Sequence, residues 1–164
     1  MKHLQCYILS IFLLLITSVS QSFAWQGKVV GVTDGDTITV MHDDVGENIR
    51  LYGVDSPEKR QPFGKKSKQF TSEMVFGEVV EVTPVKKDRY NRTVGIVHVD
   101  GKSLNEELVK HGFAWVHTRY CGKAICVKWL DLEQKAKTNK FGLWTLPDPT
   151  PPWQYRYKKR IRGY

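Results

Sequence analysis

Five short β-type segments, separated by turns, constrain the fold of this chain more than any other feature of its sequence. They are rich in β-branched residues and cover residues 27–33, 37–42, 48–54, 79–85 and 93–99. Asp34-Gly35 separates the first two segments and is a strong turn pair, while the polar run DRYNR joins the last two. The first three segments follow one another closely and indicate a meander, which is about the minimum for a stable sheet.

Three segments with helical signals lie between and after the strands. Residues 65–76 carry apolar side chains four residues apart. Ser103-Leu104-Asn105-Glu106 has the form of a capping box, so we expect a helix to begin there and to end before Gly112. Residues 124–139 carry an apolar stripe formed by Ile125, Trp129, Leu132 and Ala136.

The order of these segments predicts an α+β fold dominated by a β-barrel. Three strands, a helix, two strands and two helices fit a closed five-stranded Greek-key barrel of the OB type with three helices. The same order also permits an open α+β sheet, and the pattern alone leaves both open. The chain has 164 residues, which suits one domain with its own core, and we expect a monomer.

The chain divides into three parts, and residues 1–24 are predicted to be a secretory signal peptide. A basic start precedes the apolar run YILSIFLLLI, and Ser22-Phe23-Ala24 offers small residues at the −3 and −1 positions of a cleavage site. The run is shorter than the roughly 20 residues of a transmembrane span, although an uncleaved N-terminal anchor is an alternative. Cleavage after Ala24 predicts an exported protein, periplasmic or secreted, whose folded domain covers residues 25–146.

Residues 147–164 are predicted to be a Pro-rich linker followed by a basic tail. Four prolines between residues 147 and 152 are expected to end regular structure. Few apolar side chains follow to anchor the tail, so we expect it to be mobile. The formal net charge is +8, and the five basic residues after Thr150 supply +5 of it. A basic protein is drawn to polyanions such as nucleic acid or anionic lipid, although excess Lys and Arg also keeps a protein soluble.

Two cysteines remain once Cys6 is removed with the signal. Cys121 and Cys126 have four residues between them in an exported chain and are predicted to form a disulfide. A zinc site would need two more ligands, and the spacing to His111 and His117 matches no common zinc pattern. Free thiols are the remaining alternative.

Four polar pieces of the sequence carry the chemistry. Asp34-Gly35-Asp36-Thr37 lies at a turn, Arg50 lies in the third strand, Asp55-Ser56-Pro57-Glu58 follows that strand, and residues 88–92 form a later turn. Each piece has an ordinary structural explanation when it is taken alone, because turns and helix caps are polar by default.

Together the four pieces supply what phosphodiester hydrolysis needs. Asp36 and Asp55 offer carboxylates to a hard cation such as calcium, which prefers oxygen ligands. Arg50 and Arg92 can neutralise the charge that develops on phosphate oxygens. Glu58, three residues past Asp55, can position or deprotonate a water molecule. The set requires no His or Ser nucleophile.

The order of the motifs resembles the staphylococcal (micrococcal) nuclease family. The motifs are DGDT, an Arg in a strand that runs into VDSPE, then DRYxR and NEELVKHGFAWV, and the resemblance extends from about Gly27 to Trp144. It implies an OB-fold barrel with three helices and a calcium-dependent enzyme. It also implies hydrolysis of DNA and RNA at the P–O5′ bond, which leaves 3′-phosphorylated products.

The resemblance also assigns roles to individual residues. It implies calcium ligation by Asp36, by Asp55 and by the backbone carbonyl of Ser56, where the family usually has Thr. The implied catalytic residues are Arg50 and Arg92, which grip the phosphate, and Glu58 as general base. Contacts to the nucleotide are implied for Arg89, Tyr90 and Tyr120, and structural roles for Asn105 and Glu106. Asn91 replaces a frequent Gly, and the tract 59–66 is shorter than the family's loop.

Two other functions compete with a nuclease. The first is a non-catalytic OB-fold module that binds nucleic acid, but a degenerate copy would be expected to lose some of the five polar residues that this chain keeps. The second is an envelope-associated interaction protein whose tail, YRYKKRIRGY, binds anionic lipid. The same tail, with aromatic and basic residues interleaved, also suits long nucleic acid.

Overall fold

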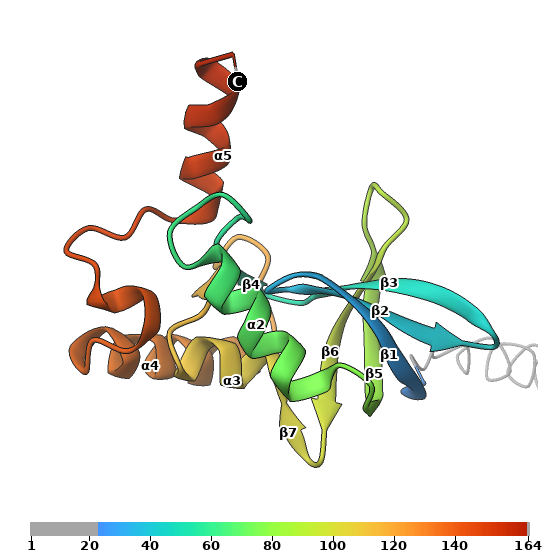
Figure 1. The fold of residues 1–164 in the computed structure, drawn as a ribbon. Coiled ribbons are helices and arrows are strands. Elements are labelled where there is room, and N and C mark those ends of the chain that lie inside the picture. The colour runs from blue at the N-terminus through green and yellow to red at the C-terminus, as the bar shows by residue number, and fades with distance from the viewer. Residues whose placement is uncertain (1–22, 164) are drawn as a thin grey trace, which may run out of the picture.

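Five strands close into a barrel in the computed structural model, which describes residues 23–163 (Figure 1). Three of them form an antiparallel meander: β1 (Trp25–Asp34), β2 (Thr37–His42) and β3 (Val45–Leu51). β5 (Val79–Lys87) pairs antiparallel with both β1 and β6 (Thr93–Val99), and β6 runs parallel to β3. The pairing of β3 with β6 closes the ring, so the predicted barrel is confirmed and the open sheet is excluded.

Alternating apolar residues fill the inside of the barrel. Ile38 and Val40 of β2 and Ile49 of β3 are fully buried, as expected for strands whose successive side chains point to opposite faces. Val80 and Val82 of β5 complete this core from the other side. A slip of one residue in any of these strands would expose its buried set, so burial fixes the register that places the polar strand ends.

The third predicted strand is interrupted, and the interruption places an acidic residue. β3 ends at Leu51, Gly53 adopts a positive φ of 70°, and β4 (Val54–Asp55) then pairs with β8 (Trp115–Val116) instead of continuing the barrel. A Cβ at Gly53 would lie 2.6 Å from the Cys121 sulfur, so only glycine fits this turn. The turn directs the chain out of the barrel and places Asp55 beside β8.

The three predicted helices are present: α2 (Gly64–Val75) packs on β1, α3 (Leu104–Lys110) packs on β6, and α4 (Ile125–Thr138) packs on α3 and β8. Ser103 caps α3, its hydroxyl accepting from the Glu106 N–H, and Gly112 follows the helix at φ 70°. Trp129 and Ala136 of α4 are buried, whereas Ile125 and Leu132 lie at the edge of the stripe. A two-residue strand, β7 (Lys102–Ser103), and a 3-10 helix, η1 (Gly142–Thr145), complete the domain.

The basic segment at the C-terminus forms a further helix, α5 (Pro152–Ile161). The expectation that the prolines end regular structure is therefore wrong for this segment. Pro152 takes the first helical position, where its missing N–H costs nothing and its fixed φ favours a helix. Pro152 is also buried, and the Trp153 ring packs against His117 with centroids 4.7 Å apart. The C-terminal end of α5 points away from the rest of the domain (Figure 1).

The predicted signal peptide lies almost wholly outside the described residues. Within residues 23–163, none of the helices has the length and apolar character required to cross a membrane.

Candidate active site

Two buried carboxylates from different strands meet beside the barrel. Asp36 lies at the turn between β1 and β2, and Asp55 ends β4; their side chains are 6% and 1% exposed. The Ser56 N–H donates to Asp36 Oδ2 at 2.5 Å and fastens the segment after β4 to this turn. A Cβ at Gly35 would lie 2.8 Å from Ser56, so glycine allows the close approach. Buried acids so close together require positive charge nearby.

Arg50 of β3 supplies part of that charge. Its guanidinium contacts the carboxylate of Asp36 and donates to Asp55 Oδ1 at 2.8 Å. Burial lowers the pKa of Arg50 from its ordinary value and the Arg92 charge lowers it further, while the Asp55 carboxylate acts in the opposite direction. Because the two guanidinium groups repel one another, the space near them favours an anion.

The turn between β5 and β6 presents Arg92 in a fixed orientation. Asp88 accepts from the backbone N–H groups of Tyr90 and Arg92, and its other oxygen accepts from Arg92 Nε at 2.8 Å. Burial acts to raise the pKa of Asp88, but these hydrogen bonds outweigh it and lower the pKa. Asn91 has a φ of 60°, a conformation that Asn tolerates better than most residues. The guanidinium of Arg92 is therefore held by its own turn.

All of the residues predicted to bind metal, catalyse or bind substrate line one open cavity of about 670 Å³. They are Asp36, Arg50, Asp55, Ser56, Glu58, Arg89, Tyr90, Arg92 and Tyr120. They come from the β1–β2 turn, from β3, from β4 and the segment after it, from the β5–β6 turn and from the loop before α4. Lys86, His117 and Arg156 line the same cavity, and the sequence patterns did not predict these three.

Two exposed tyrosines stand on the rim of this cavity. Tyr90 is 64% exposed and Tyr120 is 52% exposed, and large exposed aromatic rings suit stacking on bases. The guanidinium of Arg89 lies 4.8 Å from the Tyr90 ring centroid, and Lys86 Nζ lies 5.7 Å from that of Tyr120. The rim therefore offers ring faces next to positive charge, which single-stranded nucleic acid can use.

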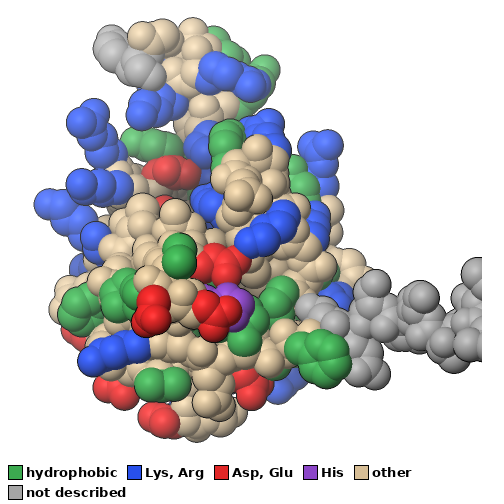
Figure 2. Space-filling view, turned by 90° about the vertical axis from the view of Figure 1, so that its right-hand side faces the viewer, with side chains coloured by type: hydrophobic (Ala, Val, Ile, Leu, Met, Phe, Trp, Pro, Cys, Tyr) green, Lys and Arg blue, Asp and Glu red, His purple; other side chains and the backbone are tan. Residues whose placement is uncertain are grey.

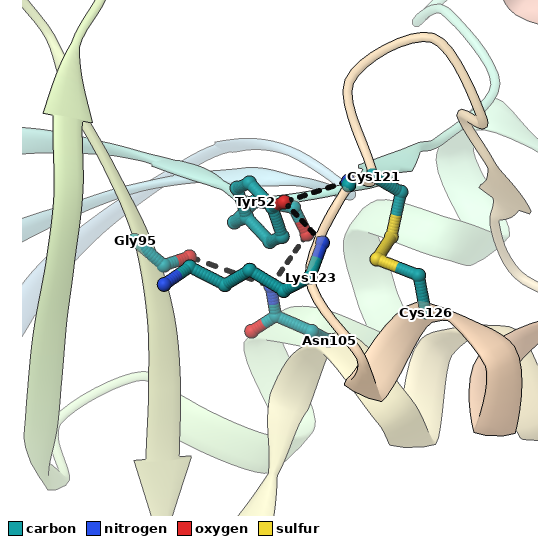
Figure 3. The surroundings of a disulfide bond; sticks show 7 residues. Tyr52, Gly95, Asn105, Cys121, Lys123 and Cys126 are labelled. Atoms are coloured by element: carbon teal, nitrogen blue, oxygen red, sulfur yellow. Dashed lines mark hydrogen bonds between the residues drawn. A yellow bond between two sulfur atoms is a disulfide. The ribbon is translucent and has the colours of Figure 1, made fainter.

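A disulfide joins Cys121 to Cys126 directly after Tyr120 (Figure 3). Tyr52 holds the same loop, since its hydroxyl accepts from the N–H groups of Gly122 and Lys123 at 2.9 and 3.2 Å. Neither cysteine lines the cavity. The bridge instead fixes the loop that carries Tyr120 to the start of α4.

Arg156 of α5 belongs to the segment that was predicted to be a basic tail. Its guanidinium donates to Asp55 Oδ2 and Glu58 Oε1, each at 2.7 Å, and to Asp55 Oδ1 at 3.2 Å. Burial acts to lower the pKa of Arg156, but the hydrogen bonds to the two acids outweigh it and raise the pKa. The signal that was available is Pro152 at a helix start, which predicts the helix but not where it docks.

Positively charged side chains gather in one part of the molecular surface. Figure 2 shows Lys and Arg side chains mostly in the upper part of this face, around α5 and the β5–β6 turn, and most acidic side chains lower down. A polyanion that approaches the cavity therefore meets basic surface on the side of α5.

The donor set of the cavity suits a hard divalent cation. Asp36 and Asp55 offer carboxylate oxygens and Ser56 a backbone carbonyl, which are oxygen ligands without sulfur or imidazole. Residues 23–163 contain no cluster of three or more His, Cys, Asp or Glu side chains placed to hold a metal ion. Two acids and one carbonyl would therefore leave further coordination places to water or substrate.

Comparison with known proteins gives a consistent result. The family model described as "Staphylococcal nuclease homologue" matches residues 48–146. A protein named "Uncharacterized endonuclease" from Escherichia coli is 40% identical over 135 residues, covering 82% of this chain and 86% of its own length. A "Micrococcal nuclease" from Shigella flexneri is 34% identical over 151 residues, covering 87% and 86%. An "Uncharacterized endonuclease" from Haemophilus influenzae is 36% identical over 135 residues, covering 82% and 74%.

The family match covers more than half of the chain, and the similarity to the bacterial relatives extends over most of this chain and most of each relative. The matched residues include Arg50, Asp55, Glu58 and Arg92, and Asp36 lies just before them. The chain belongs to the staphylococcal nuclease family and is a hydrolytic nuclease.

Proposed function

We propose that this protein is an exported, calcium-dependent endonuclease that hydrolyses phosphodiester bonds of DNA and RNA. The observation that carries the proposal is the meeting of two buried carboxylates, two arginines and Glu58 in one open cavity. Relatives named as endonuclease or micrococcal nuclease support nucleic acid as the substrate. The proposed cleavage is at the P–O5′ bond, with a 3′-phosphorylated product.

We assign each side chain a role that its position in the cavity supports. Arg50 and Arg92 bind the scissile phosphate and stabilise the negative charge that grows on its oxygens. Glu58 is 39% exposed in the cavity, where it can hold and deprotonate the attacking water. Calcium, held by Asp36, Asp55 and the Ser56 carbonyl, supplies further positive charge next to the phosphate. Arg89, Tyr90 and Tyr120 hold the nucleotide.

Cleavage assays with and without calcium test this function. The purified mature chain is incubated with single-stranded DNA, double-stranded DNA and RNA, with calcium, with magnesium and with excess chelator. We expect cleavage of both nucleic acids with calcium and none with chelator. The products should carry a 3′-phosphate that a phosphatase removes. A folded protein that binds DNA in calcium but cleaves no substrate would favour the non-catalytic OB module.

Export and oligomeric state are separate parts of the proposal. We propose cleavage of the signal peptide after Ala24, which gives a monomer that begins at Trp25. N-terminal sequencing of the protein from the culture medium and from the periplasm identifies the mature end and the compartment. Full-length protein retained with membranes would favour the uncleaved anchor instead.

A further inference from the structure

Arg156 links the C-terminal helix to the acidic residues of the site. Its guanidinium reaches Asp55 and Glu58 across 101 and 98 residues of sequence. One of its nitrogens lies 2.7 Å from Asp55 Oδ2 and the other lies 2.7 Å from Glu58 Oε1. A single cationic group therefore lies between a proposed metal ligand and the proposed general base.

These contacts engage the carboxylate that a divalent cation would need. Asp55 Oδ1 accepts from Arg50 and Arg156, and Asp55 Oδ2 accepts from Arg156. A divalent cation bound to the same carboxylate would stand close to the Arg156 charge and repel it. Binding of both cations together is therefore less favourable than the sum of binding each alone, which is the condition for competition.

Helix α5 is attached in a way that allows Arg156 to leave. Described contacts of α5 with the domain concentrate at its start, where Pro152 is buried and Trp153 packs against His117. Gln61 Nε2 also donates to the Thr150 carbonyl, just before the helix, at 2.5 Å. Arg156 itself is 45% exposed, and the residues after it are exposed. The side chain can swing out while the first turn of the helix stays docked.

We propose that Arg156 is a positioning residue that holds Asp55 and Glu58 in the metal-free protein and gives up this place to the divalent cation. The exchange keeps the buried Asp55 and the partly exposed Glu58 neutralised before the metal arrives, and it releases a guanidinium at the edge of the substrate cavity. This inference rests on the proposed function only in that Asp55 is a ligand of calcium.

Calorimetric titration of the mature chain with calcium tests the exchange. Arg156→Ala should bind calcium about 10-fold more tightly than wild type, within the usual range for coupled sites. Arg156→Lys should fall between the two, because a lysine keeps the charge but loses the forked geometry. Arg160→Ala is the matched control: it removes the same charge one turn later, from a side chain near Tyr157, and should bind calcium like wild type.

The outcomes separate positioning from general charge effects. Equal tightening by Arg156→Ala and Arg160→Ala would overturn the exchange, because the effect would come from net charge alone. Unchanged or weaker binding by a folded Arg156→Ala variant would overturn it as well. Circular dichroism establishes that each variant is folded.

Amide hydrogen exchange of residues 153–161 gives a second readout that does not depend on activity. In the wild type, calcium should speed exchange in the part of α5 beyond its docked first turn, which Arg156 no longer holds, and it should change exchange little in Arg156→Ala, where the contact is already lost. An α5 in the wild type that is equally protected with and without calcium contradicts the proposal. If calcium binds and loosens α5 but no nucleic acid is cleaved, the proposed function fails and the exchange stands.

Discussion

Asn105 of α3 is the buried polar residue whose loss should cost this fold the most. It is fully buried, accepts from the Val97 N–H at 3.1 Å, and donates to the Tyr52 carbonyl at 2.9 Å. The Asn105 amide also donates to the Gly95 carbonyl at 3.4 Å, but that carbonyl would keep a hydrogen bond from the Tyr52 N–H if Asn105 were replaced. Asn105→Ala would therefore remove the side chain that bonds the buried Val97 N–H and the buried Tyr52 carbonyl.

The expected cost follows from these two groups. A buried polar group without a partner costs about 1–3 kcal/mol, so the substitution should lower the free energy of unfolding by about 4 kcal/mol. This is a large share of the roughly 5–15 kcal/mol that stabilises an ordinary domain. The Tyr52 carbonyl directly precedes the Gly53 turn, so the same loss should loosen the segment that carries Asp55.

Urea unfolding followed by circular dichroism measures this cost. Asn139→Ala is the matched control, since Asn139 makes one exposed bond to the Lys135 carbonyl at the end of α4 and its loss should change little. An Asn105→Ala variant as stable as the Asn139→Ala variant would refute the reasoning, because water or a shifted backbone would then satisfy both interior groups.

Three further predictions concern the surroundings of the site. Replacing Cys121 and Cys126 together with Ser should lower the free energy of unfolding by about 2 kcal/mol, the loop-closure term for so short a loop; thermal melts in oxidised and reduced buffer check this, and equal stability would contradict it. Asp88→Ala should reduce kcat by on the order of 10²-fold by freeing Arg92, whereas Asp131→Ala, which breaks only an exposed pair with Lys135, should leave steady-state kinetics unchanged. Burial acts to raise the pKa of Glu47, but hydrogen bonds from Lys87, Thr93 and His42 outweigh it and lower the pKa to about 2; its contribution to stability is therefore present above pH 4.5 and lost as the pH falls towards 2. Glu47→Gln should be less stable than wild type at neutral pH and lose less stability over that range, and parallel unfolding curves for the two proteins would argue against the assignment.

The barrel could be predicted because local patterns and burial agree along most of the chain. β-branched runs between turn pairs became strands, and the capping box at Ser103 became the start of α3. What local pattern could not show is the parallel pairing of β3 with β6, which joins segments more than 40 residues apart. Sequence order therefore indicated the elements, and only the three-dimensional structure showed that they close.

The site was predictable for a different reason. Its residues stand at strand ends and turns, where a barrel brings distant positions together, and the family motifs fall on these positions. Arg156 was missed because no periodicity or motif reports the docking of a helix on residues 98 positions away. The prolines before α5 were interpreted as the end of structure, although a proline also favours the first turn of a helix.

The most direct test of the central claim is single-turnover cleavage of a labelled oligonucleotide by Glu58→Gln at saturating calcium. The substitution keeps the shape of the side chain and removes its ability to take a proton, so we expect the cleavage rate to fall by about 10²–10⁴-fold, with affinity for uncleaved DNA retained. Glu73→Gln, at an exposed position of α2 where Glu73 accepts a hydrogen bond from Gln69, should cleave like wild type. A Glu58→Gln variant that cleaves at the wild-type rate would contradict the account of this cavity as the catalytic site.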